Sequence, residues 1–418
     1  MGPSTGIGRR RAAALVVACA CAVASLTPSA ALATAIVGHA GSRGAQATAV
    51  KRGQIDALVR RAITAHDLNA VIVQVSVGGR PLFTKAYGES MTGVPATVQM
   101  HFRNGAVAIS YVSTLLLRLA DEKRVRLDDP ISKWLPGLRD SRLVTLRMLA
   151  GMSAGYPDYV RNPTFGDAIY ANPFLQVTTR DQLAFTLATP QLFTPDTNWS
   201  YSHSNYVILG LVLEKITHQP LDVALRRLVL GPLGLRSTTN STTAAIPAPV
   251  LHAYTSERRQ FLGIAPSVPF IEDSTYWNPS WTLPRGAVET TTIADMTRTA
   301  IGIGQGRLLT RRSYAEQIAP RIGFGHPQPG CPGCQTLDRV LGYGLGVFRS
   351  GSWILQNPGF GGGFGIEAYL PARRIAIAIE TTYRAGSFDA EGSAPNWATP
   401  IYTQLGALLA PGDPPPTG

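Results

Sequence analysis

Strand-like segments lie at the two ends of this chain of 418 residues, and helix-like segments fill the middle. Residues 69–88 alternate as a β-hairpin does, with Gly78 and Gly79 at the turn. Strand character returns only near the end, in residues 342–348, 353–356, 365–370 and 375–382. These two groups predict one antiparallel sheet built from both chain ends and flanked by helices, with a helical lobe inserted between them. The predicted fold class is α/β, of the α+β type.

Apolar residues at helical spacing predict the helices that accompany this sheet: 54–65, 107–122, 204–217, 221–228 and 397–409. The middle region, about residues 128–300, breaks into short helical patterns at Pro, Asn and Gly, and we assign it to the inserted lobe. Residues 34–50 are rich in Ala, Gly and Thr, which predicts a flexible linker. The folded domain is expected to span residues 51–410, followed by a disordered, proline-rich tail at 411–418.

The composition is that of a folded globular protein. Hydrophobic residues make up 45% of the chain and charged residues 15%, which excludes disorder of the whole chain. Glycine and proline follow no period and no heptad persists, so collagen-like and coiled-coil architectures are excluded too. The formal net charge is +12, but the basic residues form no clustered run. This excess gives little support for nucleic-acid binding and suits an exported protein near an anionic cell envelope.

Residues 1–33 have the pattern of an export signal. Three arginines, Arg9 to Arg11, precede the apolar run 12–26. That run is shorter than the ~20 residues that a membrane span needs, which argues against a membrane anchor. A lipid anchor at Cys19 is the other alternative, since residues 16–19 resemble a lipobox. We therefore expect a secreted or cell-envelope protein.

Cys331 and Cys334 are the only cysteines beyond the predicted signal. A redox site of the thioredoxin type would need a helix start after a strand, and the surrounding Pro and Gly residues favour a turn. A zinc site would need four ligands, and His326 is the one obvious third. In an oxidising compartment, a local disulfide that closes a surface loop is the preferred interpretation. The seven histidines show no two-ligand spacing such as His-x-x-x-His, and no metal or cofactor is expected.

Five motifs follow one another along the chain: Phe102-Arg103-Asn104-Gly105 with Leu127-Asp128-Asp129-Pro130, residues 144–147 with 153–159, residues 199–206 with Leu209-Gly210, residues 231–235, and residues 343–346. In this order they resemble the serine β-lactamase and penicillin-binding-protein superfamily, in the branch of class C β-lactamases and D-alanyl-D-alanine carboxypeptidases. The resemblance covers about residues 50–410 and implies a β-lactamase/transpeptidase-like fold. No single motif is decisive, but five in the right order argue against chance.

In that superfamily a Ser-x-x-Lys motif at the start of a helix supplies the nucleophile and its base. Counting back from Leu127 places these two positions at Ala106 and Ile109, which can supply neither. A shifted alignment does not restore the pair, because none of the five lysines has a serine three residues before it. Ser110 and Ser113 lie further along the same helix, where we expect buried or capping hydroxyls rather than nucleophiles.

The two other catalytic motifs of the superfamily are also altered. Its Tyr-x-Asn motif corresponds to Tyr201-Ser202-His203, in which His203 is either a substitute proton carrier or, more commonly for a lone histidine, a packed side chain. Its Lys-Thr-Gly or His-x-Gly motif corresponds to Gln356-Asn357-Pro358, which lacks the cation for a substrate carboxylate. The glycine-rich run from Gly359 could cradle an anion, but it is more simply a loop that allows close backbone approach. Tyr201, His203, Gln356, Asn357 and Gly359 are the candidate ligand-binding residues.

Loss of the nucleophile alone removes about six orders of magnitude of rate in a serine hydrolase. The resemblance therefore implies a pseudoenzyme that binds a peptidoglycan peptide or another acylated small molecule in the old cleft. One alternative is an active esterase, carboxypeptidase or β-lactamase that uses Tyr201 and His203, with Asp158 or Ser153 nearby. Another is a structural envelope protein whose cleft is filled by side chains. The acidic residues Glu289 and Asp295 are interpreted as caps or surface charges.

Overall fold

The computed structural model describes the backbone of residues 30–240 and 243–417, with side chains for all of these except residues 30–45 and 47. The predicted export signal, Cys19 included, lies outside the described residues except for its last four positions. In the described part of the chain, no helix combines the length and the apolar character needed to cross a membrane.

The chain divides into two units between residues 50 and 51. Helix α1 (Ala30–Ala65) begins in the first unit, so the segment 34–50 is helical and not the flexible linker that was predicted. The alanines of this segment favour a helix, because alanine has the highest helix propensity of all residues. In the second unit, the predicted helix 54–65 is confirmed, and its apolar residues Ile55, Leu58 and Val59 are buried.

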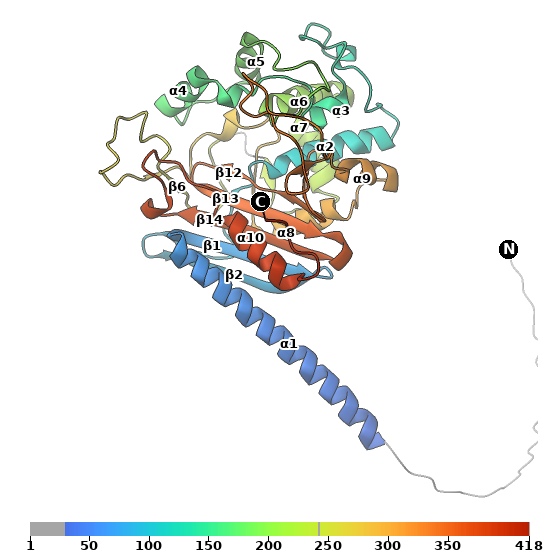
Figure 1. The fold of residues 1–418 in the computed structure, drawn as a ribbon, viewed down its shortest axis with the longest axis vertical. Coiled ribbons are helices and arrows are strands. Elements are labelled where there is room, and N and C mark those ends of the chain that lie inside the picture. The colour runs from blue at the N-terminus through green and yellow to red at the C-terminus, as the bar shows by residue number, and fades with distance from the viewer. Residues whose placement is uncertain (1–29, 241–242, 418) are drawn as a thin grey trace, which may run out of the picture. The chain divides into compact units, whose positions relative to one another are not determined.

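A nine-stranded antiparallel sheet joins the two ends of the second unit (Figure 1). Its central pair is β1 (Leu68–Val77) and β14 (Ile375–Tyr383), which aligns Val71 with Thr381. The sheet built from both chain ends is therefore confirmed. The strand order is β3 (Val94–Pro95), β2 (Arg80–Met91), β1, β14, β13 (Gly363–Leu370), β11 (Trp353–Gln356), β10 (Phe348–Ser350) and β9 (Gly342–Tyr343), with β12 (Gly359–Phe360) paired to β13.

Helices cover both faces of this sheet, which explains why every residue of β14 is buried. Helix α8 (Ile293–Gly304) packs on one face, with Gly304 against the ring of Tyr369 in β13. The register pairs Tyr369 with Ile354, so the neighbouring Trp353 points to the opposite face. There its ring meets Tyr402 of α10 (Ala398–Leu409) edge-on, with 5.4 Å between ring centroids.

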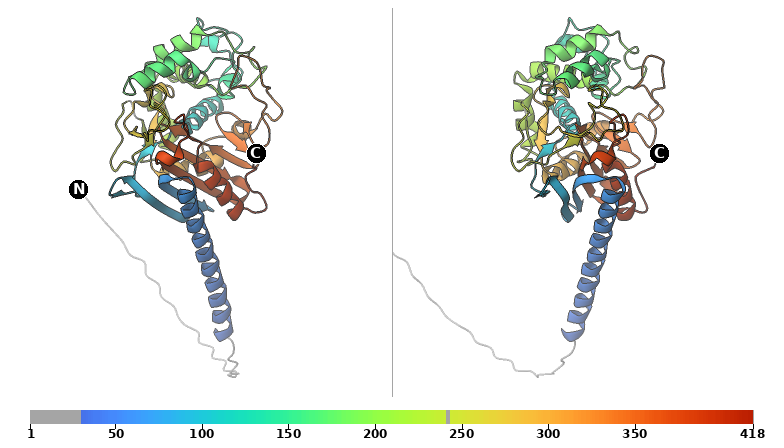
Figure 2. Two further views of the ribbon diagram at one scale, coloured as in Figure 1. Left: turned by 60° about the vertical axis from the view of Figure 1, so that its left-hand side comes forward. Right: turned by 90° about the vertical axis from the view of Figure 1, so that its left-hand side faces the viewer.

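The inserted lobe is mainly helical, as predicted, and Figure 2 shows it gathered on one side of the sheet. It also contains short strands that the sequence pattern did not indicate. Strands β8 (Glu289–Thr291) and β5 (Thr239–Asn240) form a small sheet with β4 (Phe102–Arg103), which precedes the lobe, and β6 (Tyr254–Thr255) pairs with β7 (Glu272–Asp273). The lobe contains helices α3 (Leu146–Ala150), α4 (Pro163–Ala171), α5 (Thr179–Ala188), α6 (His203–Thr217) and α7 (Leu221–Leu225). Helix α2 (Val107–Asp121) precedes it, and α9 (Arg311–Ile318) follows α8. The predicted helix 221–228 begins as α7, which ends at Leu225. The chain then continues as a π-helical turn at 226–230.

Two segments near the C-terminus differ from the sequence prediction. The run 342–348 is interrupted between β9 and β10, because Gly346 has a φ of 75° and approaches α2 so closely that a Cβ would lie 2.6 Å from the Cβ of Ser113. The tail 411–417, predicted to be disordered, packs on the domain. The indole of Trp353 donates to the carbonyl of Asp413 at 3.1 Å, and Pro415 is buried against Gly406.

Candidate ligand-binding site

A cavity of about 410 Å³ opens where α2 begins, and we call it the α2 pocket. It brings together four of the five predicted ligand-binding residues, Tyr201, His203, Asn357 and Gly359, with Ala106 at the position expected for the nucleophile. The other residues that line it are Gly105, Val160, Trp281, Thr282, Leu283 and Phe348. Residues from five distant parts of the sequence therefore share one hollow.

The first wall of the α2 pocket is the turn that leads from β4 into α2. Gly105 has a φ of 45°, and a Cβ at this position would lie 2.9 Å from the Cβ of Pro358, so only glycine fits. Ala106 is the N-cap residue of α2 and carries no side-chain oxygen to bond the first N–H groups of the helix. Ile109, one turn further, is fully buried in the main core. This wall presents backbone groups and methyl groups, with neither a hydroxyl nor an amine.

The two serines further along α2 are committed to structural hydrogen bonds. Ser110 donates to the carbonyl of Val107 at 2.7 Å. The hydroxyls of Ser113 and Tyr206 are 2.7 Å apart, and Tyr206 donates to the carbonyl of Ala150. Both serines are fully buried, as expected from the sequence, and neither lines the α2 pocket.

The second wall is the start of α6, where His203 is held from behind by Asp158. The carboxylate of Asp158 accepts from the backbone N–H of Val160 at 3.2 Å and from that of His203 at 3.3 Å. It also lies 3.1 Å from Nδ1 of His203, and its side chain is only 5% exposed. Because a carboxylate can only accept, Nδ1 is the donor in this pair, and Nε2 is the nitrogen left for a ligand.

Tyr201 lies between aromatic neighbours on the same wall. Its ring meets His203 edge-on at 5.3 Å and stacks on Phe348 at 6.1 Å, measured between centroids. Burial, followed by the nearby Asp158 carboxylate, raises the pKa of the Tyr201 phenol well above its ordinary value. Little phenolate forms near neutral pH, so Tyr201 is a poor nucleophile or base.

Gln356, the fifth predicted ligand-binding residue, does not line the α2 pocket. It is fully buried at the end of β11, and its Nε2 donates to the carbonyl of Gly346 at 2.7 Å. The two residues that reach the pocket from this strand end are Asn357 and Gly359. Among the described residues that line the α2 pocket there is no lysine or arginine. Arg161 follows the lining residue Val160 in the sequence, but its side chain lies against the turn at Gly333.

The interpretation of Glu289 and Asp295 as caps or surface charges is wrong, because both are fully buried and the N-cap of the nearby helix α8 is Thr292. Glu289 lies behind the first wall, where Asn104 donates to its Oε2 at 3.3 Å, and burial raises its pKa to about 8. Asp295 accepts from the backbone N–H of Ser237 at 2.6 Å and pairs with Arg298 at 2.5 Å. The sequence did not reveal this burial, since acidic residues beside Thr-rich segments usually lie at the surface.

Two further candidates from the sequence lie away from the α2 pocket. Ser153 donates to Asp196 at 3.0 Å and has no histidine partner within the described residues. Cys331 and Cys334 form the predicted local disulfide, with 5.3 Å between their Cα atoms. The bond closes a turn and is not part of the pocket lining.

Sequence reasoning missed the segment 281–283, which supplies Trp281, Thr282 and Leu283 to the α2 pocket. The segment has no regular periodicity, and it reaches the pocket because Trp281 stacks on Phe360, with 5.8 Å between ring centroids. The one available signal was an aromatic residue in a loop rich in polar residues and prolines.

Comparison with known proteins assigns the family. The family model described as Beta-lactamase matches residues 55–398, which is most of the chain. The chain belongs to the β-lactamase family. This family includes the serine β-lactamases and penicillin-binding proteins, so the family resemblance seen in the motifs is confirmed.

Relatives and solved structures agree with this assignment. The chain is 33% identical over 153 residues to "Penicillin-binding protein 4" of Amycolatopsis lactamdurans, a match that covers 35% of this chain and 38% of the relative. It is 28% identical over 199 residues to "Esterase EstB" of Burkholderia gladioli, covering 44% of this chain and 50% of the relative. The chain therefore spans half or less of the length of these relatives. The structure of a D-stereospecific amidohydrolase from Streptomyces sp. superposes with a TM-score of 0.66 at 26% identity, covering 78% of this chain and 94% of that one.

Proposed function

We propose that this protein is an exported member of the β-lactamase family that binds a peptide-like ligand in the α2 pocket without forming an acyl-enzyme. The observation that carries this proposal is the open cavity at the start of α2, which has Ala106 at its edge and the apolar, fully buried Ile109 behind it. Without an alcohol and an amine at these positions, the wall can bind a ligand but cannot attack it.

The groups around the α2 pocket suit a neutral ester or amide. The first N–H groups of α2, those of Val107, Ala108 and Ile109, already donate to the carbonyls of residues 104–106. The polar groups left for a ligand are Nε2 of His203, which accepts from a ligand N–H when Nδ1 carries the proton, and the amide of Asn357, which can bond a carbonyl group or an N–H. No lysine or arginine lines the described pocket, and the carboxylate of Asp158 lies behind His203. Recognition therefore uses the amide groups of a peptidoglycan peptide rather than its terminal carboxylate. The esterase and the amidohydrolase among the similar proteins act on bonds of these two classes, which supports the choice of ligand.

The proposal is tested by two measurements on the same protein. Incubation with a fluorescent penicillin is expected to give no covalent label on a denaturing gel. Addition of a muropeptide is expected to raise the melting temperature, and a ligand at 100 times its dissociation constant stabilises a protein by about 2.7 kcal/mol. The variant Ala106→Phe, which fills the cavity, should abolish this shift, while Ala171→Phe on the exposed end of α4 should retain it. A covalent label, or a muropeptide shift that Ala106→Phe leaves unchanged, would refute the proposal.

A second candidate function is hydrolysis by water that His203 activates. The specific observation in its favour is the contact between Nδ1 of His203 and Asp158, because this orientation suits a general base. A chromogenic ester tests it, with His203→Ala and Tyr201→Phe as the variants. Turnover that His203→Ala abolishes and Tyr201→Phe preserves would replace the binding role with a hydrolase. A purely structural role predicts a filled cleft, which the cavity of about 410 Å³ does not support.

A further inference from the structure

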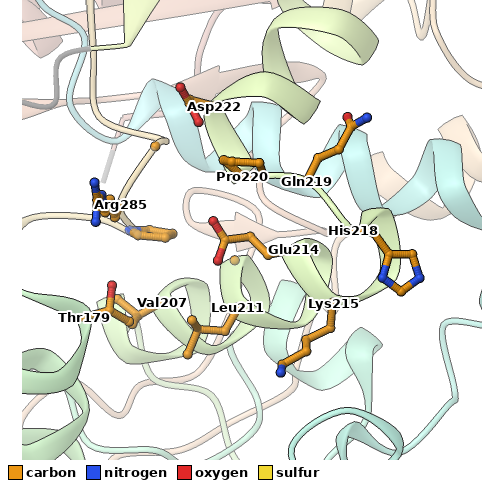
Figure 3. Close-up of a pocket in the computed structure, with 13 residues that line it drawn as sticks. Thr179, Val207, Leu211, Glu214, Lys215, His218, Gln219, Pro220, Asp222 and Arg285 are labelled. Atoms are coloured by element: carbon orange, nitrogen blue, oxygen red, sulfur yellow. The ribbon is translucent and has the colours of Figure 1, made fainter.

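A second hollow, of about 830 Å³, lies between α6, α7 and residues 284–286, and we call it the outer groove (Figure 3). It shares no lining residue with the α2 pocket, and the function proposed above uses none of its residues. It continues into a hollow of about 770 Å³ along the first turn of α5, and the two hollows share Thr179, Arg285 and Gly286. Each of the two has the size of a site for a small molecule or a short peptide.

Two close backbone contacts hold the wall of the outer groove in place. A Cβ on Gly210 of α6 would lie 2.6 Å from the Cβ of Pro284, so the segment 284–286 lies directly on the helix. Gly286 has a φ of 95°, and a Cβ there would lie 2.8 Å from the backbone nitrogen of Asp222. The wall that carries Arg285 is therefore fixed on both sides by contacts that only glycine permits. A wall fixed in this way loses little conformational freedom when a ligand binds.

Charges of opposite sign line this groove without pairing with one another. Glu214 and Lys215 come from α6, Asp222 comes from α7, and Arg285 comes from the facing segment. Figure 3 shows the ammonium end of Lys215 pointing away from the carboxylate of Glu214. None of the four takes part in an ion pair of the described residues. One oxygen of Glu214 accepts from the backbone N–H of Leu221 at 2.9 Å, which fixes this carboxylate beside the hollow. Leu211 adds a partly exposed apolar side chain, while Val207 and Pro284, which also line the groove, are buried.

We propose that the outer groove binds a short peptide with both termini free, whose carboxylate lies at Arg285 and whose ammonium lies at Glu214 and Asp222. Such a ligand carries both charges at a separation that its own backbone sets, and so satisfies both walls at once. A simple anion or cation would satisfy one wall only. The small apolar surface suits side chains of the size of alanine.

Trialanine, its N-acetyl form and its C-terminal amide are the probes for this site, used in calorimetric titrations of the full chain. The Ala106→Phe variant serves as the titrated protein, so that the α2 pocket is blocked. Each partly exposed ion pair contributes up to about 1 kcal/mol, so either cap should weaken binding about fivefold. Arg285→Gln should weaken trialanine by the same factor and remove the difference between the acid and the amide. Glu214→Gln combined with Asp222→Asn should remove the difference between the free and the acetylated amine.

Arg373→Gln, an exposed change outside the groove, is the matched control and should leave all three affinities unchanged. No measurable binding of trialanine, or equal binding of the three probes, would overturn the proposal. A third result would also overturn it: trialanine binds the unsubstituted chain and its Arg285→Gln variant equally well but does not bind Ala106→Phe. The peptide would then occupy the α2 pocket. None of these results bears on the proposed function of the α2 pocket, which is tested separately with the fluorescent penicillin and the muropeptide.

Discussion

The two walls of the α2 pocket each have a buried carboxyl group behind them, and the two carboxyl groups are bonded differently. Asp158, behind the α6 wall, accepts from two backbone N–H groups and from the ring of His203. Glu289, behind the α2 wall, accepts from one amide at 3.3 Å, and its Oε1 has no partner among the described residues. Burial raises the pKa of Glu289 to about 8, so this group is mostly neutral at pH 7.

This difference in bonding reflects the structural role of the Asp158 carboxylate. The Asp158 carboxylate also serves the backbone, since it caps the 3₁₀ turn at 159–161 and bonds the first N–H of α6. Its side chain is held in place whether or not the pocket does chemistry. The α2 wall has no comparable structural use for a hydroxyl or an amine, and there the side chains are those of Ala106 and Ile109. The comparison thus predicts that a charge is tolerated behind one wall and not within the other.

The largest expected effect is on the α2 wall. Ile109→Lys should lower the free energy of unfolding by about 3–5 kcal/mol, because it places an unpaired charge at a fully buried position. Urea unfolding at pH 7 measures the change, and Ile109→Met is the matched control, with an expected cost below about 1.5 kcal/mol. If the lysine variant were as stable as the methionine variant, the α2 wall would still accommodate a catalytic amine, and the contrast between the walls would fail.

Removal of the carboxylate on the other wall should have the next largest effect. Asp158→Ala leaves the N–H groups of Val160 and His203 without their acceptor, which should cost about 2–3 kcal/mol in urea unfolding. Asp158→Asn keeps one oxygen acceptor and should cost about half as much. Equal costs for the two variants would mean that charge, rather than capping, explains why Asp158 is retained.

The pH dependence of stability tests the neutral state of Glu289. The folded-state pKa of Glu289 is raised above its ordinary value, so its contribution to stability is present below about pH 4.5 and is lost as the pH rises towards 8. Between pH 5 and pH 8, Glu289→Gln should reduce the loss of stability by up to about 1.4 kcal/mol per pH unit. Glu367, whose pKa burial also raises to about 8, is the control away from the pocket. Glu367→Gln should change the slope similarly without affecting ligand binding. An unchanged slope in Glu289→Gln would contradict the neutral state of this group.

Most of the sheet could be predicted because its signals are local. The glycine pair at the hairpin turn and the runs 353–356 and 375–382 each identify a strand from neighbouring residues alone. The break at Gly346 and the packing of the tail could not be predicted in this way. Both depend on contacts with residues far along the chain, Ser113 in the first case and Trp353 in the second.

The residues of the candidate site could be predicted where a sequence motif places them at or near the start of a helix. Ala106, Tyr201 and His203 were placed by motif spacing, and the structure brings them into one pocket. Gln356 was placed by the same spacing, but its amide turns inward to the carbonyl of Gly346. A sequence position fixes the backbone, while the direction of a side chain depends on which partner is nearest. For the same reason the role of Asp158 could only be suspected until its three donors were seen.

The smallest expected effect comes from returning a hydroxyl to the α2 wall. Ala106→Ser changes a half-buried position by one oxygen, so the free energy of unfolding should move by no more than about 0.5 kcal/mol. The variant should stay unlabelled by a fluorescent penicillin, because Ile109 supplies no amine to take the serine proton, and a serine without a base is a poor nucleophile. Mass spectrometry of the intact protein makes this measurement, with the unsubstituted chain as control. An acyl adduct on Ser at position 106 would mean that His203 or Tyr201 can act as the base across the pocket. The α6 wall would then be a catalytic half that lacks only its nucleophile.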